Sequence, residues 1–241
     1  MTKPTILVPN DVGIHNASDY TSRLDKAKSY RDLSTIIVCP TRGMIPARMV
    51  QSWQGLIRPM NQKVIGPIFM EGMEVGEAYN SVIKMILENE ELSKFKFMLT
   101  LEEDNAPPAD GLIKLYESID DYDAIGGLYW TKGDDGQPMC YGDPKVMPLN
   151  FIPQTPQPDS IVPCNGLGMG FTLFRVEMFK DKRFEYGHWF KTKQEVVPGQ
   201  GAQVYTQDLW FFQNAHKLGY KVACDSRVKV GHYDAVNQIM W

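Results

Sequence analysis

The sequence has few cysteines and lacks any long apolar run. Its four cysteines are spread over 241 residues and include no C-x-x-C pair. This disfavours a zinc site and a disulfide framework, so reduced cysteines in the core are expected. No apolar run approaches the roughly 18 residues of a membrane helix, and the apolar part of the N-terminal segment is too short for a signal peptide. We therefore expect a cytoplasmic protein without a membrane span.

The sequence also lacks an excess of basic charge. It has 25 Lys and Arg residues against 29 Asp and Glu residues, which gives a formal net charge of −4 and a pI near 5.6. A dedicated nucleic-acid binder normally carries a basic footprint, so stable nucleic-acid binding is not expected. An enzyme that handles such a substrate briefly is still compatible with this charge. The 43% hydrophobic content is that of an ordinary globular protein.

Short apolar runs alternate with segments of helical periodicity between residues 34 and 130. The runs predict strands at 34–40, 63–69, 97–101 and 123–130. The periodic segments predict helices from about residue 46, at 75–89 and at 111–119, and the first of these should bury Met49, Val50 and Trp53. Strands that alternate with helices predict an α/β fold with a Rossmann-type, mostly parallel sheet and helices on both faces.

The regular alternation ends after Trp130. Seven of the 16 prolines fall between residues 138 and 163, which excludes long helices and central strands there and predicts an irregular Pro-rich insertion. Further along, the patterns predict a strand at 171–174, a mobile loop at 181–205, a helix from the N-cap Thr206 to near Gly219, and strands at 221–225 and 228–230.

These patterns also suggest a domain organisation. We expect residues 1–33 to form an N-terminal extension packed on a single domain of residues 34–241. Within that domain the regular alternation of residues 34–130 gives way to the less regular residues 131–241.

Three acidic side chains, Glu102, Glu103 and Asp104, directly follow the run at 97–101. Ligands of open α/β sheets bind beyond the carboxyl ends of the strands, and like charges packed there repel one another unless a cation lies among them. We expect Asp104 to be a metal ligand with Glu102 as the second member of the pair, and Glu103 to point to the opposite side. A solvated acidic turn is the alternative.

Five motifs follow one another between about Ser34 and His232. They are Val38–Arg42 after the first strand, Val75–Asn80 at a helix start, Leu101–Pro108, Gly166–Phe171, and Gln207–Phe211 followed by a strand and His232. In this order they resemble a GT-A-type glycosyltransferase of the family-two-like group. Two positions depart from that pattern: Glu102 stands where the metal motif usually has its first Asp, and Tyr79 stands where Arg is usual.

The resemblance implies a GT-A-like fold and a metal-dependent glycosyltransferase that takes its sugar from a nucleotide-diphosphate sugar, with a UDP type favoured. Residues 34–241 would then be a single GT-A-like catalytic domain, with a nucleotide-binding half at 34–130 and an acceptor-binding half at 131–241. It implies Mn²⁺ or Mg²⁺ as the cofactor and adds His232 to the metal ligands Glu102 and Asp104. The candidate residues for binding the nucleotide sugar are Pro40, Thr41, Arg42, Asn80, Glu102, Glu103, Gly168 and Gly170. The two glycines would let the backbone approach the sugar closely, or they form a bulge beside a crowded neighbour.

Asp208 is the candidate catalytic residue. In inverting relatives a carboxylate at the start of this helix accepts the proton of the acceptor hydroxyl. An Asp in the first turn of a helix also stabilises that helix through its dipole, so a purely structural role is the alternative.

Two other functions are open at this stage. A nucleotidyltransferase also pairs such a sheet with acidic metal ligands, and a non-catalytic module could bind a sugar or nucleotide on the same fold. The acceptor could be a glycan, a small molecule or a modified nucleobase, because nothing in the sequence separates them.

Overall fold

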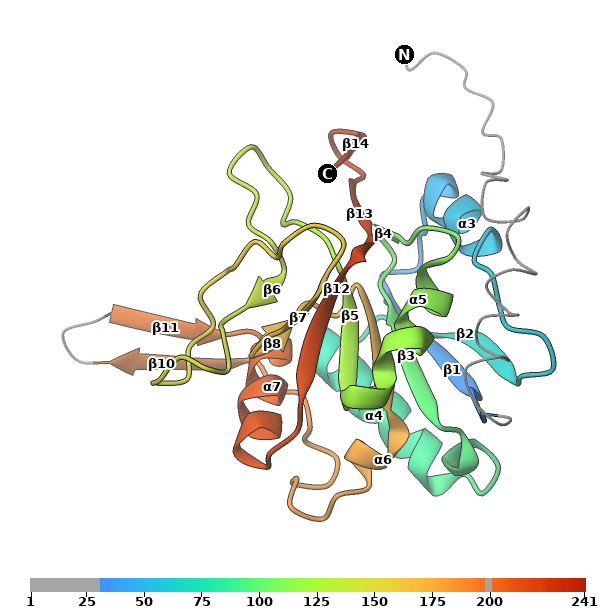
Figure 1. Ribbon diagram of the computed structural model, residues 1–241, viewed down its shortest axis with the longest axis horizontal. Coiled ribbons are helices and arrows are strands. Elements are labelled where there is room, and N and C mark those ends of the chain that lie inside the picture. The colour runs from blue at the N-terminus through green and yellow to red at the C-terminus, as the bar shows by residue number, and fades with distance from the viewer. Residues whose placement is uncertain (1–30, 198–200) are drawn as a thin grey trace.

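The computed structural model describes residues 31–197 and 201–241, and it shows a seven-stranded sheet with helices against both faces (Figure 1). Residues 1–30 of the expected N-terminal extension lie outside this range. The strands of the sheet are β1 (Thr35–Thr41), β2 (Val64–Glu71), β3 (Phe97–Leu101), β5 (Ala124–Leu128), β7 (Ile161–Pro163), β9 (Phe171–Arg175) and β12 (Val222–Lys229). The α-helices are α3 (Ala47–Gln54), α4 (Val75–Glu88), α5 (Gly111–Ser118), α6 (Val176–Phe179) and α7 (Gln207–Lys217), and η1 (Leu92–Lys94) and η2 (Ile119–Asp121) are short 3₁₀ helices.

The strands β1, β3 and β5 are buried on both faces, which explains why they read as continuous apolar runs. Successive side chains of a strand point to opposite faces. Ile36 of β1 and Met98 of β3 therefore pack in one core layer, whereas Ile37 and Leu99 pack in the other. The strands expected at 34–40 and 97–101 are confirmed, and the one expected at 123–130 is shorter than predicted.

The strand order is β2-β1-β3-β9-β5-β12-β7. β2, β1, β3, β5 and β12 run parallel, while β9 and β7 run antiparallel to their neighbours. The predicted mostly parallel sheet is thus confirmed. However, β9 lies between β3 and β5 in the middle of the sheet, so two strands that are consecutive in the predicted alternation are not neighbours.

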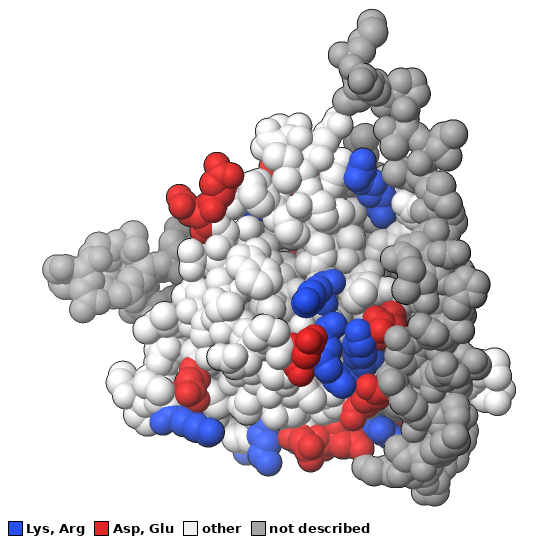
Figure 2. All heavy atoms as spheres, turned by 45° about the horizontal axis from the view of Figure 1, so that its top comes forward, with Lys and Arg blue, Asp and Glu red and all other residues white. Residues whose placement is uncertain are grey.

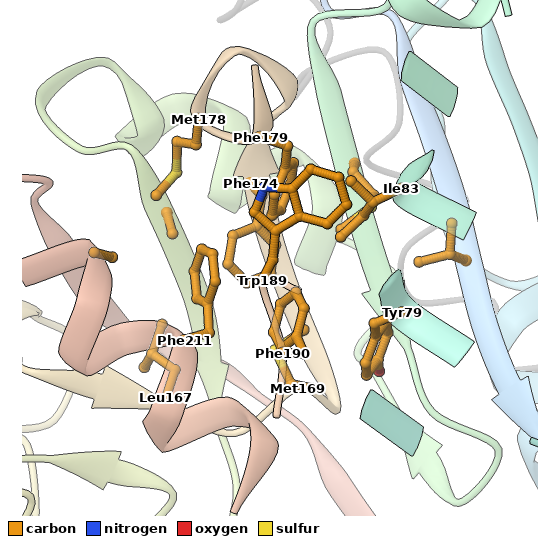
Figure 3. Packing of buried hydrophobic residues seen from close by; sticks show 14 of the residues in the cluster. Tyr79, Ile83, Leu167, Met169, Phe174, Met178, Phe179, Trp189, Phe190 and Phe211 are labelled. Carbon is orange, nitrogen blue, oxygen red and sulfur yellow. The ribbon is translucent and has the colours of Figure 1, made fainter. Parts of the chain in front are cut away.

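Helices α4 and α7 cover one face of the sheet, and α5 covers the other. The predicted apolar face of α4 is confirmed, because Tyr79 and Ile83 are buried in the first of these layers. Figure 3 shows both side chains on the side of α4 that faces the aromatic residues Trp189 and Phe190. The rings of Phe190 and Phe211 stack with their centroids 4.6 Å apart, so this layer joins α4 to α7.

Helix α3 begins at Ala47 as expected, but its inner face differs from the prediction. Met49 is buried and Trp53 is half-buried, whereas Val50 is 38% exposed. Residues four apart share a helix face while neighbours are about 100° apart, so Val50 lies off the face that Met49 and Trp53 define. The Trp53 Nε1–H donates to the Asn105 carbonyl at 2.9 Å, which ties α3 to the chain just after the acidic residues.

Three small sheets complete the fold. β6 (Cys140–Tyr141) pairs with β8 (Gly166–Leu167), and β4 (Asn105–Ala106) pairs with β13 (Gly231–Asp234), which in turn pairs with β14 (Ile239–Met240). The segment 181–205 was expected to be a loop, but it ends in an antiparallel hairpin of β10 (Lys193–Val197) and β11 (Gly201–Tyr205). That expectation was therefore wrong for the two strands.

The four cysteines are all buried and free, as expected. In the part of the chain that the structure describes, no helix is both long enough and apolar enough to cross a bilayer.

Candidate active site

A cavity of about 420 Å³ opens beyond the carboxyl end of β3. The acidic residues lie there because β3 ends at Leu101 and the chain turns at once, with the Asn105 N–H donating to the Glu102 carbonyl at 3.0 Å. β1 runs parallel to β3 and ends at the same edge. The cavity is lined by Pro40, Thr41, Arg42, Met73, Val75, Glu102, Glu103, Asp104, Lys132 and Gln207.

Glu103 points toward the end of β1, away from the other two carboxylates. Its Oε2 accepts hydrogen bonds from the Thr41 hydroxyl at 2.7 Å and the Arg42 N–H at 2.8 Å, and its Oε1 accepts one from the Arg42 Nε at 2.5 Å. Burial alone would raise the pKa of Glu103, but these donors outweigh it and lower the pKa. The Arg42 side chain is 83% exposed, so its guanidinium is open to a ligand.

Glu102 faces the opposite way, toward α4 and α7. The Tyr79 hydroxyl donates to its Oε1 at 3.2 Å, so the two positions that depart from the family pattern contact each other. Burial raises the pKa of Glu102 to about 8, and the charges of Asp104 and Asp208 add to this rise. The charged form of Glu102 is thus disfavoured, whereas the charged form of the adjacent Glu103 is favoured.

Asp104 interacts with two basic side chains. Its Oδ2 lies 2.5 Å from the Lys132 Nζ and 3.5 Å from the His232 Nε2. Burial would raise the pKa of Asp104, but the nearby His232 and Lys132 side chains lower it to about 2. His232 is close because β13 pairs with β4, which sets His232 opposite Asn105, and because the Tyr233 N–H donates to the Asp104 carbonyl at 2.7 Å.

Asp104 and His232 fit the chemistry of a divalent-cation site, although they supply only part of one. The His232 Nδ1 lies 2.7 Å from the Trp130 carbonyl. When Nδ1–H donates to this carbonyl, Nε2 keeps its lone pair and faces Asp104, which is the arrangement of many metal-binding histidines. In residues 31–197 and 201–241, no group of three or more His, Cys, Asp or Glu side chains is arranged to hold a metal ion. Further ligands would have to come from a substrate or water.

Asp208 lies in the first turn of α7, as expected, but it does not line the cavity. Its side chain is buried, and its Oδ1 accepts hydrogen bonds from the Thr206 hydroxyl and the Leu209 N–H. Burial raises the pKa of Asp208. Asp208 is near enough to Glu102 to raise that group's pKa as well.

Three other candidate residues have mainly structural contacts. The Asn80 amide bonds both backbone groups of Phe190, donating to its carbonyl at 2.7 Å and accepting from its N–H at 2.9 Å. A Cβ on Gly168 would lie 2.1 Å from the Tyr129 hydroxyl oxygen, and one on Gly170 would lie 2.5 Å from the side-chain oxygen of Asn105. These glycines therefore permit close packing against Tyr129 and Asn105. This fits the alternative in which they lie beside crowded neighbours, rather than the one in which they let the backbone approach a sugar.

Sequence reasoning missed Lys132, Gln207 and Met73, which line the cavity, and the contact between Tyr79 and Glu102. Lys132 had a signal: it follows β5, which runs parallel to β3, and carboxyl ends of parallel strands meet at one edge. Met73 lies two residues before α4, and no pattern in the sequence points to it. Gln207 begins α7 and belongs to the motif Gln207–Phe211, but no feature of the sequence assigned it to the site.

The charges on the outer surface are mixed. Figure 2 shows one face on which Lys and Arg side chains adjoin Asp and Glu side chains, outside the grey residues, without forming a broad patch of one sign. The described part of this face therefore lacks the basic footprint of a nucleic-acid binder.

The sheet order, with its central antiparallel strand and an acidic turn at the end of β3, defines a GT-A-type fold, as the sequence predicted. No protein-family model and no curated protein matches the sequence. Among solved structures, the chain is similar to A197 from STIV, with a TM-score of 0.56 and 17% identity over 86% of this chain and 92% of that one. It is also similar to GalNAc-T7, crystallised with UDP, GalNAc and Mn²⁺, with a TM-score of 0.54 and 12% identity over 95% of this chain and 53% of that chain.

Proposed function

We propose that this protein is a glycosyltransferase that transfers a sugar from a nucleotide-diphosphate sugar, UDP-type favoured, to a hydroxyl group of a glycan, small molecule or modified nucleobase. The observation that carries this proposal is the cavity at the end of β3, which is lined by an exposed guanidinium, by the ionised carboxylate of Glu103 and by Asp104, a carboxylate that lies next to the imidazole of His232. The GT-A-type fold supports it, because solved GT-A structures include a protein that was crystallised with a nucleotide and Mn²⁺.

The end of β1 would bind the nucleotide. Pro40, Thr41 and Arg42 line the cavity beside Glu103, whose carboxylate can accept hydrogen bonds from ribose hydroxyl groups. The Arg42 guanidinium would make a charge-assisted contact with the diphosphate. Its Nε donates to Glu103, and most of the Arg42 side chain is exposed to the cavity and solvent.

Asp104 and His232 would hold a divalent cation, together with oxygens of the diphosphate. Such a cation, when bound, neutralises the charge that develops on the departing diphosphate. One carboxylate and one imidazole suit Mn²⁺. Glu102 would contribute less directly, because its Oε1 already accepts from Tyr79 and its raised pKa opposes the charged form.

Asp208 would act as the general base. The acceptor oxygen forms a bond to the anomeric carbon of the sugar while the bond from that carbon to the diphosphate oxygen breaks. The acceptor proton passes to the Asp208 carboxylate, and its raised pKa makes it a better proton acceptor than an exposed Asp. Asp208 is only 6% exposed, so an acceptor has little direct access to its carboxylate.

That burial favours one alternative, a non-catalytic module that binds a nucleotide or sugar without transferring it. A nucleotidyltransferase is less well supported, because the loop after β1 offers one basic side chain, Arg42, and no Gly-rich phosphate loop. Turnover separates both alternatives from the lead proposal.

The experiment is calorimetry of UDP and GDP with the full chain, in Mn²⁺ and in EDTA, followed by a donor-hydrolysis assay with a panel of nucleotide sugars. We expect UDP to bind in Mn²⁺ and to lose most of its affinity in EDTA and in Asp104→Asn. Asp110→Asn is the matched control, because Asp110 also pairs with a lysine but lies outside the cavity. Equal affinities in Mn²⁺ and EDTA would contradict the metal role. Binding without any hydrolysis or transfer would favour the non-catalytic module.

A further inference from the structure

The Lys132 ammonium group forms an ion pair with one carboxylate oxygen of Asp104, the residue that we propose as the main metal ligand. Its Nζ lies 2.5 Å from the Asp104 Oδ2, the same oxygen that lies 3.5 Å from the His232 Nε2. A divalent cation binds a carboxylate oxygen at roughly 2.1 to 2.5 Å. A cation between Asp104 and His232 would therefore compete with the ammonium group for the same oxygen and would repel it.

The backbone around Lys132 is fixed by several contacts. The Thr131 N–H donates to the Gln137 carbonyl at 2.9 Å, and the Gln137 N–H donates to the Thr131 hydroxyl at 2.8 Å. These bonds close a turn after β5. The carbonyl of Trp130, the residue before Thr131, lies 2.7 Å from the His232 Nδ1. One short segment thus orients the imidazole and carries the competing ammonium group.

The Lys132 side chain also lines the cavity, and it is 31% exposed. Its long, flexible stem allows the ammonium group to move by several ångströms without a change in the backbone. A diphosphate in the cavity would offer the ammonium group a stronger partner than Asp104, because a diphosphate carries more negative charge than one carboxylate.

We propose that Lys132 is a built-in competitor that makes divalent-cation binding depend on the nucleotide. Without nucleotide, the ammonium group stays on Asp104 and the cation binds weakly. When the diphosphate of a nucleotide enters, Lys132 moves to it and releases the Asp104 oxygen, so the cation and the nucleotide bind cooperatively. This inference rests on the proposed function, since it needs the cation site and the diphosphate in the same cavity.

Linkage makes this proposal quantitative. If nucleotide raises the affinity for the cation by some factor, then the cation raises the affinity for nucleotide by the same factor. Removing the ammonium group should release Asp104 permanently, so that the cation binds more tightly without nucleotide. It should also remove one contact to the diphosphate, so that the nucleotide binds less tightly and the coupling becomes smaller.

The test measures Mn²⁺ binding to the full chain by electron paramagnetic resonance of free Mn²⁺, without nucleotide and with saturating UDP. For the wild type we expect UDP to raise the Mn²⁺ affinity at least tenfold. For Lys132→Met we expect Mn²⁺ without UDP to bind at least tenfold more tightly than it binds to the wild type, and UDP to add less than threefold. Lys132→Arg keeps the positive charge and should behave like the wild type.

Lys114→Met is the matched control. Lys114 pairs with Asp110 at 2.9 Å, and the exposed fractions of that pair, 24% and 14%, are close to the 31% and 20% of Lys132 and Asp104. The Lys114→Met variant should bind Mn²⁺ with the affinity of the wild type, both without and with UDP. If UDP binds the wild type with Mn²⁺ but Lys132→Met shows the wild-type Mn²⁺ affinity without UDP, the competitor role is wrong and the proposed function stands. If the wild type binds no UDP under any condition, the proposed function fails, and this inference fails with it.

Discussion

Glu102 and Glu103 are adjacent in the sequence, yet they lie in two regions with opposite electrostatic character. The Glu103 side, defined here as Thr41, Arg42 and Glu103, surrounds a carboxylate with three donated hydrogen bonds and lowers its pKa. The Glu102 side, defined as Tyr79, Glu102 and Asp208, surrounds a carboxyl group with one hydroxyl donor and other carboxylates.

The difference follows from the local geometry. Adjacent residues at a strand end point to opposite sides, so Glu103 reaches the end of β1 while Glu102 reaches the α4–α7 layer. Neighbouring acids whose pKa values are driven apart are a common mark of divided roles in active sites. We therefore propose that the Glu103 side binds the nucleotide and that the Glu102 side takes part in proton transfer.

The largest expected effect belongs to the Glu102 side. Asp208→Asn should lower turnover by roughly a hundredfold, the usual contribution of a general base, and it should leave UDP affinity within about twofold. Because burial already disfavours the charged form of Asp208, the free energy of unfolding should fall by no more than about 1 kcal/mol. Calorimetry, thermal unfolding and rate measurements on the one variant check all three expectations.

Glu77→Gln is the control for that experiment. Glu77 is an exposed acidic residue in the first turn of α4 and does not line the cavity, so it has a similar relation to a helix dipole outside the proposed site. It should keep full turnover. An Asp208→Asn variant with normal turnover per folded molecule would assign Asp208 to helix stabilisation and end the division of roles proposed here.

A smaller effect is expected on the Glu103 side. Arg42→Ala should weaken UDP binding by about tenfold or more, because a charge-assisted hydrogen bond contributes about 1.5 to 3 kcal/mol. Turnover at saturating donor should change much less. Stability should change by less than about 1 kcal/mol, since the ion pair with Glu103 involves an exposed guanidinium.

Arg48→Ala controls for a general loss of positive charge, because Arg48 is exposed on α3 and does not line the cavity. UDP affinity that falls equally in both arginine variants would point to long-range attraction rather than a contact from Arg42. A large loss of turnover at saturating donor in Arg42→Ala would contradict a role of Arg42 in nucleotide binding alone.

The most direct comparison comes from the pH dependence of stability in Glu102→Gln and Glu103→Gln, which tests the electrostatics of the two sides rather than turnover or affinity. The folded protein holds a proton on Glu102 up to about pH 8, whereas an ordinary Glu loses it near 4.5. Between these values the unfolded chain binds fewer protons, so Glu102 lowers the free energy of unfolding as pH rises, by at most about 1.4 kcal/mol per pH unit. Glu102→Gln should therefore gain stability relative to the wild type from pH 5 to 8.

Glu103 should show the opposite sign. Its pKa is lowered in the folded protein, so it stabilises the fold above the unfolded pKa of about 4.5, and that contribution disappears as the pH falls through the folded pKa. Glu103→Gln should be less stable than the wild type at pH 6 and approach it in acid. Urea unfolding at several pH values measures both differences, and curves that run in parallel would show that the two sides do not differ.

Much of the fold could be predicted because its signals are local. The strands β1 and β3 are apolar runs bounded by polar residues, and α4 repeats apolar residues at helical spacing, so each pattern is contained in fewer than about 15 residues. The acidic residues after β3 could be placed at a ligand-binding edge for the same reason, since the crevice rule needs only the strand and its end.

The tertiary structure alone decided which distant segments meet. The pairing of β4 with β13 brings His232 to Asp104, the turn after β5 brings Lys132 to the same oxygen, and the insertion of β9 separates β3 from β5. Strand pairing and side-chain contacts between segments far apart in the chain depend on the packing of the whole core, and no short pattern encodes them. The sequence by itself thus determined the main strands and helices and the acidic edge. The packing determined that Glu102 lies among carboxylates and Glu103 among donors, because only the neighbours supplied by β1, α4 and α7 make two adjacent glutamates different.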